Sequence, residues 1–272
     1  MFKHVAIVYK PTRQCLALAQ GFFKELKEQG FIVDTVWVDE VKQGDLDTYD
    51  LVLSIGGDGT LLKISWSLLD RSPLILPIPC GRRTVYYEDL DIRDIHSIVE
   101  KILDGRFCID ILKRICLSFS SKKYFALNEV AMINQHLGRV LTINVEISTP
   151  YNKSRFYIEG DGLIVATASG SSAYVLSAGA SVIEPKITGI YLAPLNPMNM
   201  NIAPIFLHSF TRIRVTPRGY TNVFVDGIYV GTISPGNSVE CMLSNNNIRL
   251  VRLSCRGDVV RSIFASRTTL FK

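Results

Sequence analysis

The pattern of apolar and polar positions differs between the first hundred residues and the rest of the chain. In the first hundred residues, patterns typical of strands alternate with patterns typical of helices. Short apolar runs predict strands at residues 4–9, 31–37, 50–55 and 74–78, and amphipathic stretches predict helices at 12–29, 60–69 and 91–104. In the first helix Ala19, Phe22 and Leu26 fall on one face, and Gly30 is placed to end it. This order predicts a Rossmann-like parallel sheet with helices, an α/β domain at residues 1–105.

The pattern changes near residue 105. From there to about residue 253 the chain is mostly short runs rich in Ile, Val, Thr and Tyr, separated by turn signals such as Pro217-Arg218-Gly219. We therefore expect residues 106–253 to form a β-rich domain that resembles a β-sandwich. Residues 254–272 follow as a separate C-terminal segment with a helix-like period.

Composition favours an enzyme with two lobes. The chain has 272 residues, of which 47% are apolar, enough for two modest cores. No apolar run approaches the roughly 20 residues that cross a bilayer, and the N-terminus opens a strand instead of a signal peptide, so we expect a cytoplasmic protein without a membrane partner. The net charge of +5 is mild and evenly spread, which argues against nucleic-acid binding but suits anionic nucleotides.

The six cysteines are scattered without the close paired spacing of a zinc site. Most of them lie in apolar runs. We expect them to pack as small hydrophobic side chains and to hold no structural metal.

The segment Ile55-Gly56-Gly57-Asp58-Gly59-Thr60 joins a predicted strand to a predicted helix. At such a junction glycines let backbone N–H groups approach an anion, and the helix N-terminus adds favourable potential. A carboxylate beside a phosphate is unfavourable because both are negatively charged. It is explained if the carboxylate binds Mg²⁺ or accepts a proton from an attacking hydroxyl. The ordinary alternative is that Asp58 only caps the helix.

Three further motifs follow in order. They are Asn128-Glu129 after a strand-like run, Gly160-Asp161-Gly162 at the start of another, and a turn from Ser169 to Tyr174 followed by Ser177-Ala178-Gly179-Ala180. The aspartate loop alone is shared by NAD kinases, diacylglycerol-type lipid kinases and 6-phosphofructokinases. With the later motifs, the stretch from about residue 50 to residue 230 resembles the NAD kinase family.

The resemblance implies transfer of the terminal phosphoryl group of ATP, or of polyphosphate, to the 2′-hydroxyl of the adenosine ribose of NAD. It makes Asp58 the catalytic base or its organiser, with Mg²⁺ or another divalent cation nearby and no dedicated set of protein ligands. Gly57, Gly59 and Thr60 are expected to hold donor phosphates. It also implies that the C-terminal segment 254–272 returns to the first domain, and that the protein is a homo-oligomer, a dimer or tetramer.

The same resemblance assigns eight residues to NAD: Asn128, Glu129, Asp161, Ser169, Ser172, Ala173, Tyr174 and Ser177. A carboxylate at Glu129 suits ribose hydroxyls and would repel a 2′-phosphate. Asp161 is expected to bind the nicotinamide amide, and Tyr174 offers a stacking face. Each motif also has an ordinary structural interpretation. The Asn-Glu pair fits a surface turn, Asp161-Gly162 fits a hairpin turn, and the run from Ser169 fits a Ser-rich helix cap.

The segment 77–87 departs from the family, which usually has several glycines ending in Gly-Phe. Here only Gly81 remains and Arg82 and Arg83 are added. One hypothesis is that Arg82 or Arg83 contacts phosphates of the donor or of the dinucleotide through its guanidinium group; the alternative is a solvated pair. Asp226-Gly227 is expected as a hairpin turn, and its second interpretation is a site motif of the family.

Two other functions remain open at this point. A lipid or sphingoid kinase shares the aspartate loop, and a catalytically silent dinucleotide-binding regulatory protein fits the altered segment 77–87. The sequence does not decide between ATP and polyphosphate, or between NAD and NADH.

Overall fold

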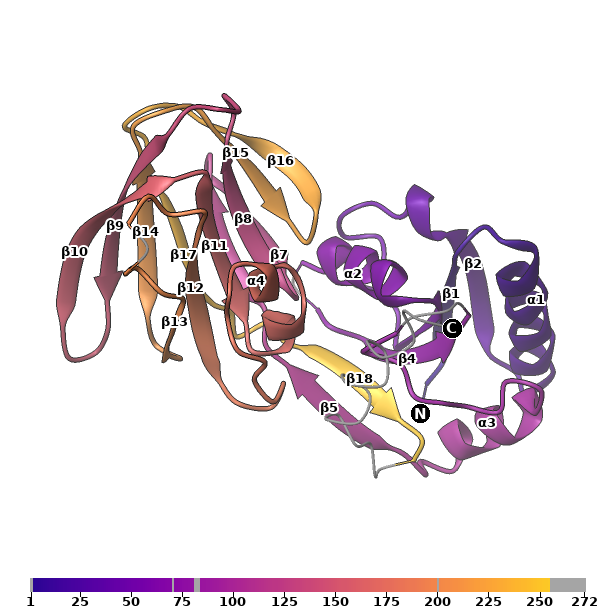
Figure 1. Ribbon diagram of the computed structural model, residues 1–272. Helices are drawn as coiled ribbons and strands as arrows, with labels where there is room; N and C mark the ends of the chain where they lie inside the picture. Colours follow the sequence, from indigo (N-terminus) through magenta and orange to yellow (C-terminus); the bar gives the residue numbers. More distant parts are fainter. Residues whose placement is uncertain (1, 70, 81–83, 200, 255–272) are drawn as a thin grey trace, which may run out of the picture. The chain divides into compact units, whose positions relative to one another are not determined.

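The computed structural model describes residues 2–69, 71–80, 84–199 and 201–254 (Figure 1). The described chain forms two compact units, one made of residues 2–112 together with residues 246–254 and the other of residues 113–245. Within the described part of the chain, no helix has the length and apolar character that a membrane span requires.

The first unit is built on a six-stranded sheet. Its order is β2 (Ile32–Trp37), β1 (His4–Tyr9), β3 (Leu51–Gly56), β4 (Leu74–Pro79), β18 (Ile248–Arg252) and β5 (Cys108–Leu112). All neighbours run parallel except β5, which is antiparallel to β18. The strands predicted in the first hundred residues are therefore confirmed.

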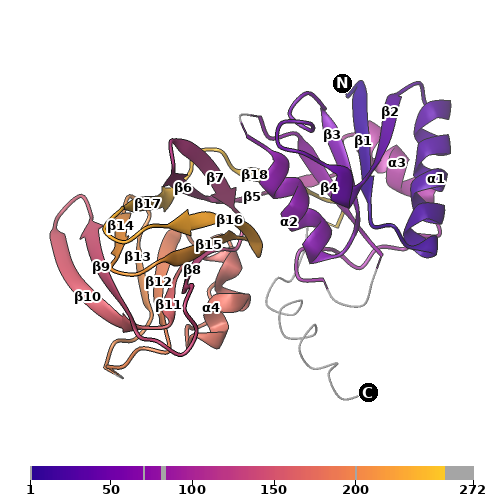
Figure 2. The ribbon, with the colours of Figure 1, turned by 90° about the horizontal axis from the view of Figure 1, so that it is seen from above.

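Helices cover both faces of this sheet (Figure 2). One face packs against α1 (Arg13–Glu28) and α3 (Ile95–Leu103), and the shared core includes Ile7, Phe22 and Ile98. The other face carries α2 (Asp58–Ser67) and the short 3-10 helix η1 (Val38–Glu40). Strands β1, β3 and β4 are buried along nearly their whole length because both of their faces are covered.

The boundary of the first unit differs from the sequence-based expectation. Strands β5 and β18 lie in the range 106–253 that was expected to form the β-rich domain. Yet they pair with each other, and β18 pairs with β4 in the first sheet. Short β runs carry no local sign of the sheet they will join, because that choice depends on long-range pairing. The segment expected to return to the first domain lies outside the described residues, apart from Ser254.

The second unit consists of two six-stranded antiparallel sheets. One has the order β10 (Lys153–Gly160), β9 (Leu141–Ser148), β14 (Arg212–Pro217), β17 (Val239–Leu243), β6 (Ile115–Phe119) and β7 (Lys122–Ala126). The other has the order β13 (Ile205–His208), β12 (Gly189–Leu195), β11 (Gly162–Thr167), β8 (Glu129–Asn134), β15 (Thr221–Val225) and β16 (Ile228–Ile233). The prediction of a β-rich region of the sandwich type is confirmed.

The inner strands of the second sheet are covered on both faces. Every residue of β11 and β12 is buried, whereas β9 alternates between buried and half-buried positions. The extra cover comes from the segment after β11, which forms the 3-10 helix η2 (Ser169–Ser172) and the short helix α4 (Tyr174–Ser177). Val175 and Ala180 of this segment pack against Ile164 of β11. The turn that the sequence analysis singled out is thus fixed on the sheet.

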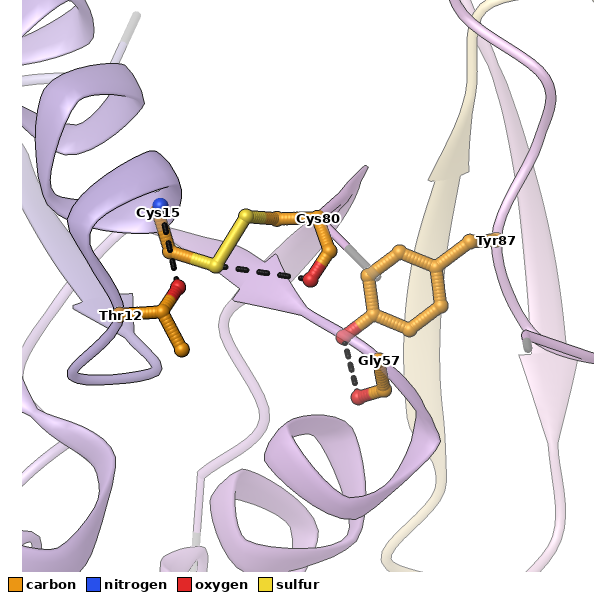
Figure 3. Close-up of a disulfide and its surroundings, with 5 residues drawn as sticks. All are labelled: Thr12, Cys15, Gly57, Cys80 and Tyr87. Atoms are coloured by element: carbon orange, nitrogen blue, oxygen red, sulfur yellow. Dashed lines mark hydrogen bonds between the residues drawn. A yellow bond between two sulfur atoms is a disulfide. The ribbon is translucent and has the colours of Figure 1, made fainter. Parts of the chain in front are cut away.

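One expectation about the cysteines is wrong. Cys15, in the first turn of α1, forms a disulfide with Cys80, which directly follows β4 (Figure 3). Their Cα atoms lie 5.8 Å apart, within the range that a disulfide spans, because α1 packs beside the end of β4. Among the described residues the free cysteines are Cys116 and the buried Cys241.

Candidate functional site

The glycine–aspartate loop lies where β3 ends and α2 begins. Gly57 is the N-cap residue in an extended conformation, and its carbonyl accepts hydrogen bonds from the N–H groups of Thr60 at 2.9 Å and Leu61 at 3.3 Å. Asp58 is already the first helical residue, and its side chain does not cap the helix. The interpretation of Asp58 as an ordinary helix cap is therefore wrong. The N–H groups of Asp58 and Gly59 belong to the first turn, where the helix offers no carbonyl partner.

The carboxylate of Asp58 is held by the segment that follows β4. Its Oδ1 accepts hydrogen bonds from the N–H groups of Val85 at 3.0 Å and Tyr86 at 3.1 Å, and its Oδ2 lies 2.9 Å from the same Val85 nitrogen. Burial raises the pKa of Asp58, and the two N–H donors oppose that shift without cancelling it. The side chain is thus a fixed, partly desolvated carboxylate with a raised proton affinity, as a general base requires.

A tyrosine completes the support of this loop. The hydroxyl of Tyr87 donates to the carbonyl of Gly57 at 2.8 Å (Figure 3). The same hydroxyl lies 2.7 Å from the hydroxyl of Ser54 on β3. Both side chains are buried, and burial raises the pKa of Tyr87 far above its usual value, so the hydroxyl stays protonated. No local pattern in the sequence links residue 87 to residue 57, so this contact could not be predicted.

Thr60 does not present its hydroxyl to solvent. It is buried at 5% exposure, and its side chain packs on Gly56, where any side chain would collide with it. Gly59, in contrast, is exposed, with no neighbouring atom within 4 Å of where a Cβ would stand. Of the three residues expected to hold donor phosphates, Gly59 is therefore exposed, Gly57 is half-buried, and the Thr60 side chain is enclosed. Arg82 lies outside the described residues.

In the second unit, the Asn-Glu pair is organised by a third residue. Asn128 and Glu129 lie between β7 and the start of β8, and the carboxylate of Asp226 accepts from the N–H groups of Leu127 at 2.7 Å, Asn128 at 2.8 Å and Glu129 at 3.1 Å. Asp226 has a φ of 48° and precedes Gly227 in the turn between β15 and β16, so the hairpin prediction is confirmed. Its carboxylate also holds the backbone of the Asn-Glu pair, which agrees with the second interpretation of this motif as part of a site.

Glu129 is a buried carboxyl group with unused hydrogen-bonding capacity. It accepts a hydrogen bond from the backbone N–H of Tyr174, while its Oε2 is buried with no partner among the described residues. Burial, together with the nearby Asp226, raises the pKa of Glu129 to about 8. A buried oxygen without a partner is costly unless a ligand or a proton satisfies it.

The small-residue turn lies against the Asn-Glu pair. A Cβ on Gly170 would come within 2.7 Å of the Cα of Asn128, so only glycine permits this approach. Ser169 is buried, and its hydroxyl lies 2.9 Å from that of Thr167. Tyr174 is 41% exposed, and Ser177 is also exposed. The structure thus brings together Asn128, Glu129, Ser169, Ser172, Ala173, Tyr174 and Ser177 in one region.

Asp161 is the exception among the residues assigned to NAD. It precedes β11, whereas the Ser169 turn follows that strand, so six strand residues separate the two ends. At about 3.3 Å per residue this places Asp161 about 20 Å from the turn. Asp161 is exposed, and its carboxylate accepts from the amide nitrogen of Asn196 at 2.8 Å. The structure does not bring Asp161 to the Asn-Glu pair.

Comparison with known proteins gives one consistent family. The model of the ATP-NAD kinase N-terminal domain matches residues 5–107, and that of the ATP-NAD kinase C-terminal domain matches residues 127–253. Among curated proteins, the NAD kinase of Caldicellulosiruptor bescii is 34% identical over 212 residues, covering 76% of this chain and 78% of the relative. The NAD kinase of Fusobacterium nucleatum is 32% identical over 207 residues, covering 74% and 76%.

Solved structures agree on the fold. An NAD kinase from Archaeoglobus fulgidus in complex with ATP superposes with a TM-score of 0.80 at 22% identity, covering 98% of this chain and 100% of that one. Yeast NADH kinase complexed with NADH gives a TM-score of 0.83 at 19% identity, covering 100% and 89%. With both family models matched in order along the chain, the protein belongs to the NAD kinase family.

Proposed function

We propose that this protein transfers the terminal phosphoryl group of ATP to the 2′-hydroxyl of the adenosine ribose of NAD, forming NADP. Membership of the NAD kinase family supports the reaction, and the ATP complex of the Archaeoglobus fulgidus relative supports ATP as the donor. The observation that carries the mechanism is the position of Asp58 at the N-terminus of α2. Its carboxylate is held there by hydrogen bonds from the N–H groups of Val85 and Tyr86. Nothing in the comparisons favours a lipid kinase or a silent binding protein.

Asp58 acts as the base in this mechanism. As the 2′-oxygen attacks the terminal phosphorus, its proton passes to the Asp58 carboxylate, a new oxygen–phosphorus bond forms, and the bond to the leaving ADP breaks. The raised pKa of Asp58 suits this role, because a carboxylate of very low pKa would be a poor proton acceptor. Its hydrogen bonds leave it oriented before the substrate binds.

The donor phosphates bind at the N-terminus of α2. The N–H groups of Asp58 and Gly59 point out of the first turn, and Gly59 is exposed, so phosphate oxygens can approach the backbone closely. Mg²⁺ fits this site as a companion of the donor. Mg²⁺ is commonly held by one or two carboxylates together with substrate phosphates and waters, and Asp58 supplies one carboxylate. When bound, it would neutralise phosphate charge.

NAD is held by the second unit. The Oε2 atom of Glu129, which has no partner among the described residues, can accept a hydrogen bond from a ribose hydroxyl. Asn128, the preceding residue, offers a side-chain amide. The close approach of Gly170 to Asn128 keeps the Ser169–Tyr174 turn against this pair. We further propose that the protein is a cytoplasmic homo-oligomer, which cell fractionation and light scattering would test.

An assay specific for NADP tests the proposed reaction. Purified protein is incubated with NAD, Mg²⁺ and either ATP or polyphosphate, and diacylglycerol replaces NAD in a parallel sample. We expect NADP from NAD with ATP and no phosphorylated lipid. Absence of NADP with every donor, from protein that still binds NAD by calorimetry, would favour a silent binding protein instead.

A further inference from the structure

The hydroxyl of Tyr87 occupies the centre of a short hydrogen-bond chain. It donates its single proton to the carbonyl of Gly57 at 2.8 Å, so the hydroxyl of Ser54, 2.7 Å away, must be the donor to the Tyr87 oxygen. Ser54 is fully buried and Tyr87 is 6% exposed. The chain therefore runs in one direction, from β3 through Tyr87 to the N-cap of α2.

This chain fixes the orientation of the peptide bond between Gly57 and Asp58. The carbonyl of Gly57 also accepts from the N–H of Thr60, so it points into the first turn of α2. A trans peptide is planar, and its N–H points opposite to its C=O. Holding the Gly57 carbonyl therefore aims the Asp58 N–H outward, away from the helix.

Tyr87 also belongs to the segment that holds the Asp58 side chain. The N–H groups of Val85 and Tyr86, immediately before it, donate to the Asp58 carboxylate. The same segment is secured on its other side, because Arg252 donates to the carbonyl of Tyr86 at 2.7 Å. Glu88, the next residue, accepts from the N–H of Leu253 at 2.7 Å. The residues on both sides of Tyr87 are thus held, Tyr86 through its carbonyl and Glu88 through its carboxylate, and Tyr87 adds a side-chain link to the Gly57 carbonyl.

We infer that Tyr87 is a positioning residue for phosphoryl transfer, which keeps both the carboxylate and the N–H of Asp58 aligned by holding the Gly57 carbonyl. The inference rests on the proposed function. It assigns Tyr87 no contact with substrate. Tyr87 ends the segment 77–87, in which Gly81 is the one glycine and the arginines Arg82 and Arg83 follow it in sequence.

The substitution Tyr87→Phe tests the inference because it removes one hydroxyl and leaves the ring. We expect kcat to fall and the KM for ATP to rise, with about a tenfold loss in kcat/KM for ATP, equivalent to one hydrogen bond, while the KM for NAD stays unchanged. The matched control is Tyr191→Phe. Tyr191 is also buried, and its hydroxyl donates to the carbonyl of Ser181 at 2.8 Å, away from the aspartate loop in sequence and in the other unit.

A second pair of variants keeps the test valid if Tyr87→Phe folds poorly. Ser54→Ala removes the donor to Tyr87, and its control, Ser67→Ala, removes a buried hydroxyl that donates to the carbonyl of Ile64 at the far end of α2. We expect Ser54→Ala to lower kcat/KM for ATP. In the double variant Ser54→Ala, Tyr87→Phe, kcat/KM for ATP should fall no further than in Tyr87→Phe alone. Ser67→Ala should lower only stability.

The kinetics of the variants test the role of Tyr87, and NADP formation by the wild type tests the proposed function. Wild-type kinetics in Tyr87→Phe, or an equal kinetic loss in Tyr191→Phe, would overturn the positioning role while the wild type still makes NADP. A wild-type protein that makes no NADP would instead overturn the proposed function itself.

Discussion

The carboxylate of Asp226 accepts a hydrogen bond from the backbone N–H of Asn128 at 2.8 Å, although 98 residues separate the two in sequence. The N–H groups of Leu127 and Glu129 donate to the same carboxylate. A hairpin turn in the second unit therefore determines the backbone conformation of the pair proposed to bind NAD.

The substitution Asp226→Asn should disturb that pair without changing side-chain size. An amide offers one oxygen acceptor where the carboxylate offers two, so at least one buried N–H loses its partner. We expect a loss of about 1–3 kcal/mol in the free energy of unfolding, measured in urea, and weaker NAD binding by calorimetry. Glu146→Gln is the control, because Glu146 lies on β9 in the other sheet of the second unit, where it pairs with the exposed Arg155. Unchanged NAD affinity in Asp226→Asn would contradict this organising role.

Glu129 should make stability depend on pH. Its pKa is raised from 4.5 to about 8 in the folded protein, so between these values the folded state binds a proton that the unfolded state has released. The stability that protonated Glu129 contributes is therefore fully present below pH 4.5, and it is lost as the pH rises through about 8. We expect Glu129→Gln to flatten this part of the curve of unfolding free energy against pH. An identical slope in the two proteins would show that Glu129 titrates normally.

Gly170 should tolerate no side chain. A Cβ there would come within 2.7 Å of both the Cα and the carbonyl carbon of Asn128, and backbone atoms cannot move aside cheaply. We expect Gly170→Ala to lower both the melting temperature and the affinity for NAD, as the turn is pushed away from the Asn-Glu pair. A variant that keeps wild-type NAD affinity would show that the contact between turn and pair is dispensable.

The disulfide between Cys15 and Cys80 should stabilise the first unit. It joins residues separated by 65 positions, and a link of this kind commonly contributes about 2–4 kcal/mol by restricting the unfolded chain. Under oxidising conditions we expect the double variant Cys15→Ala, Cys80→Ala to unfold at lower urea concentration than wild type, with Cys116→Ala as the control. Peptide mapping without reductant should find the two cysteines linked. Two free thiols there would refute the disulfide.

In a reducing compartment the same pair would be two thiols. The sulfur of Cys15 lies 3.4 Å from the carbonyl oxygen of Cys80, so the reduced Cys15 thiol has an acceptor in place. Disulfides are uncommon in cytosolic proteins, and the proposed cytoplasmic location therefore makes the redox state of this pair a direct question for peptide mapping of protein from cells.

Local sequence patterns predicted most of the first unit and the position of the aspartate loop. The apolar run before Gly56 and the amphipathic stretch after Gly57 are local signals, and they correctly predicted a strand joined to a helix. The Asn128-Glu129 pair and the Ser169 turn were identified by their order along the chain, and the structure brings them together.

Contacts between distant residues could not be predicted in this way. Tyr87 meets Gly57, and Cys80 meets Cys15, only because β4 lies beside β3 and α1 packs on the same sheet. No periodicity in the sequence reports such pairings. For the same reason β18 could not be assigned to the first sheet, since its partner β4 lies far upstream in the chain.

The rate of NADP formation by Asp58→Asn tests the central claim most directly, because the substitution keeps size and removes the ionisable group. We expect kcat to fall by about 10²–10⁴-fold while NAD binding by calorimetry is unchanged. Asp91→Asn, which alters an exposed carboxylate paired with Arg93, should keep the wild-type rate. An Asp58→Asn protein that forms NADP at the wild-type rate would contradict the assignment of Asp58 as the catalytic base.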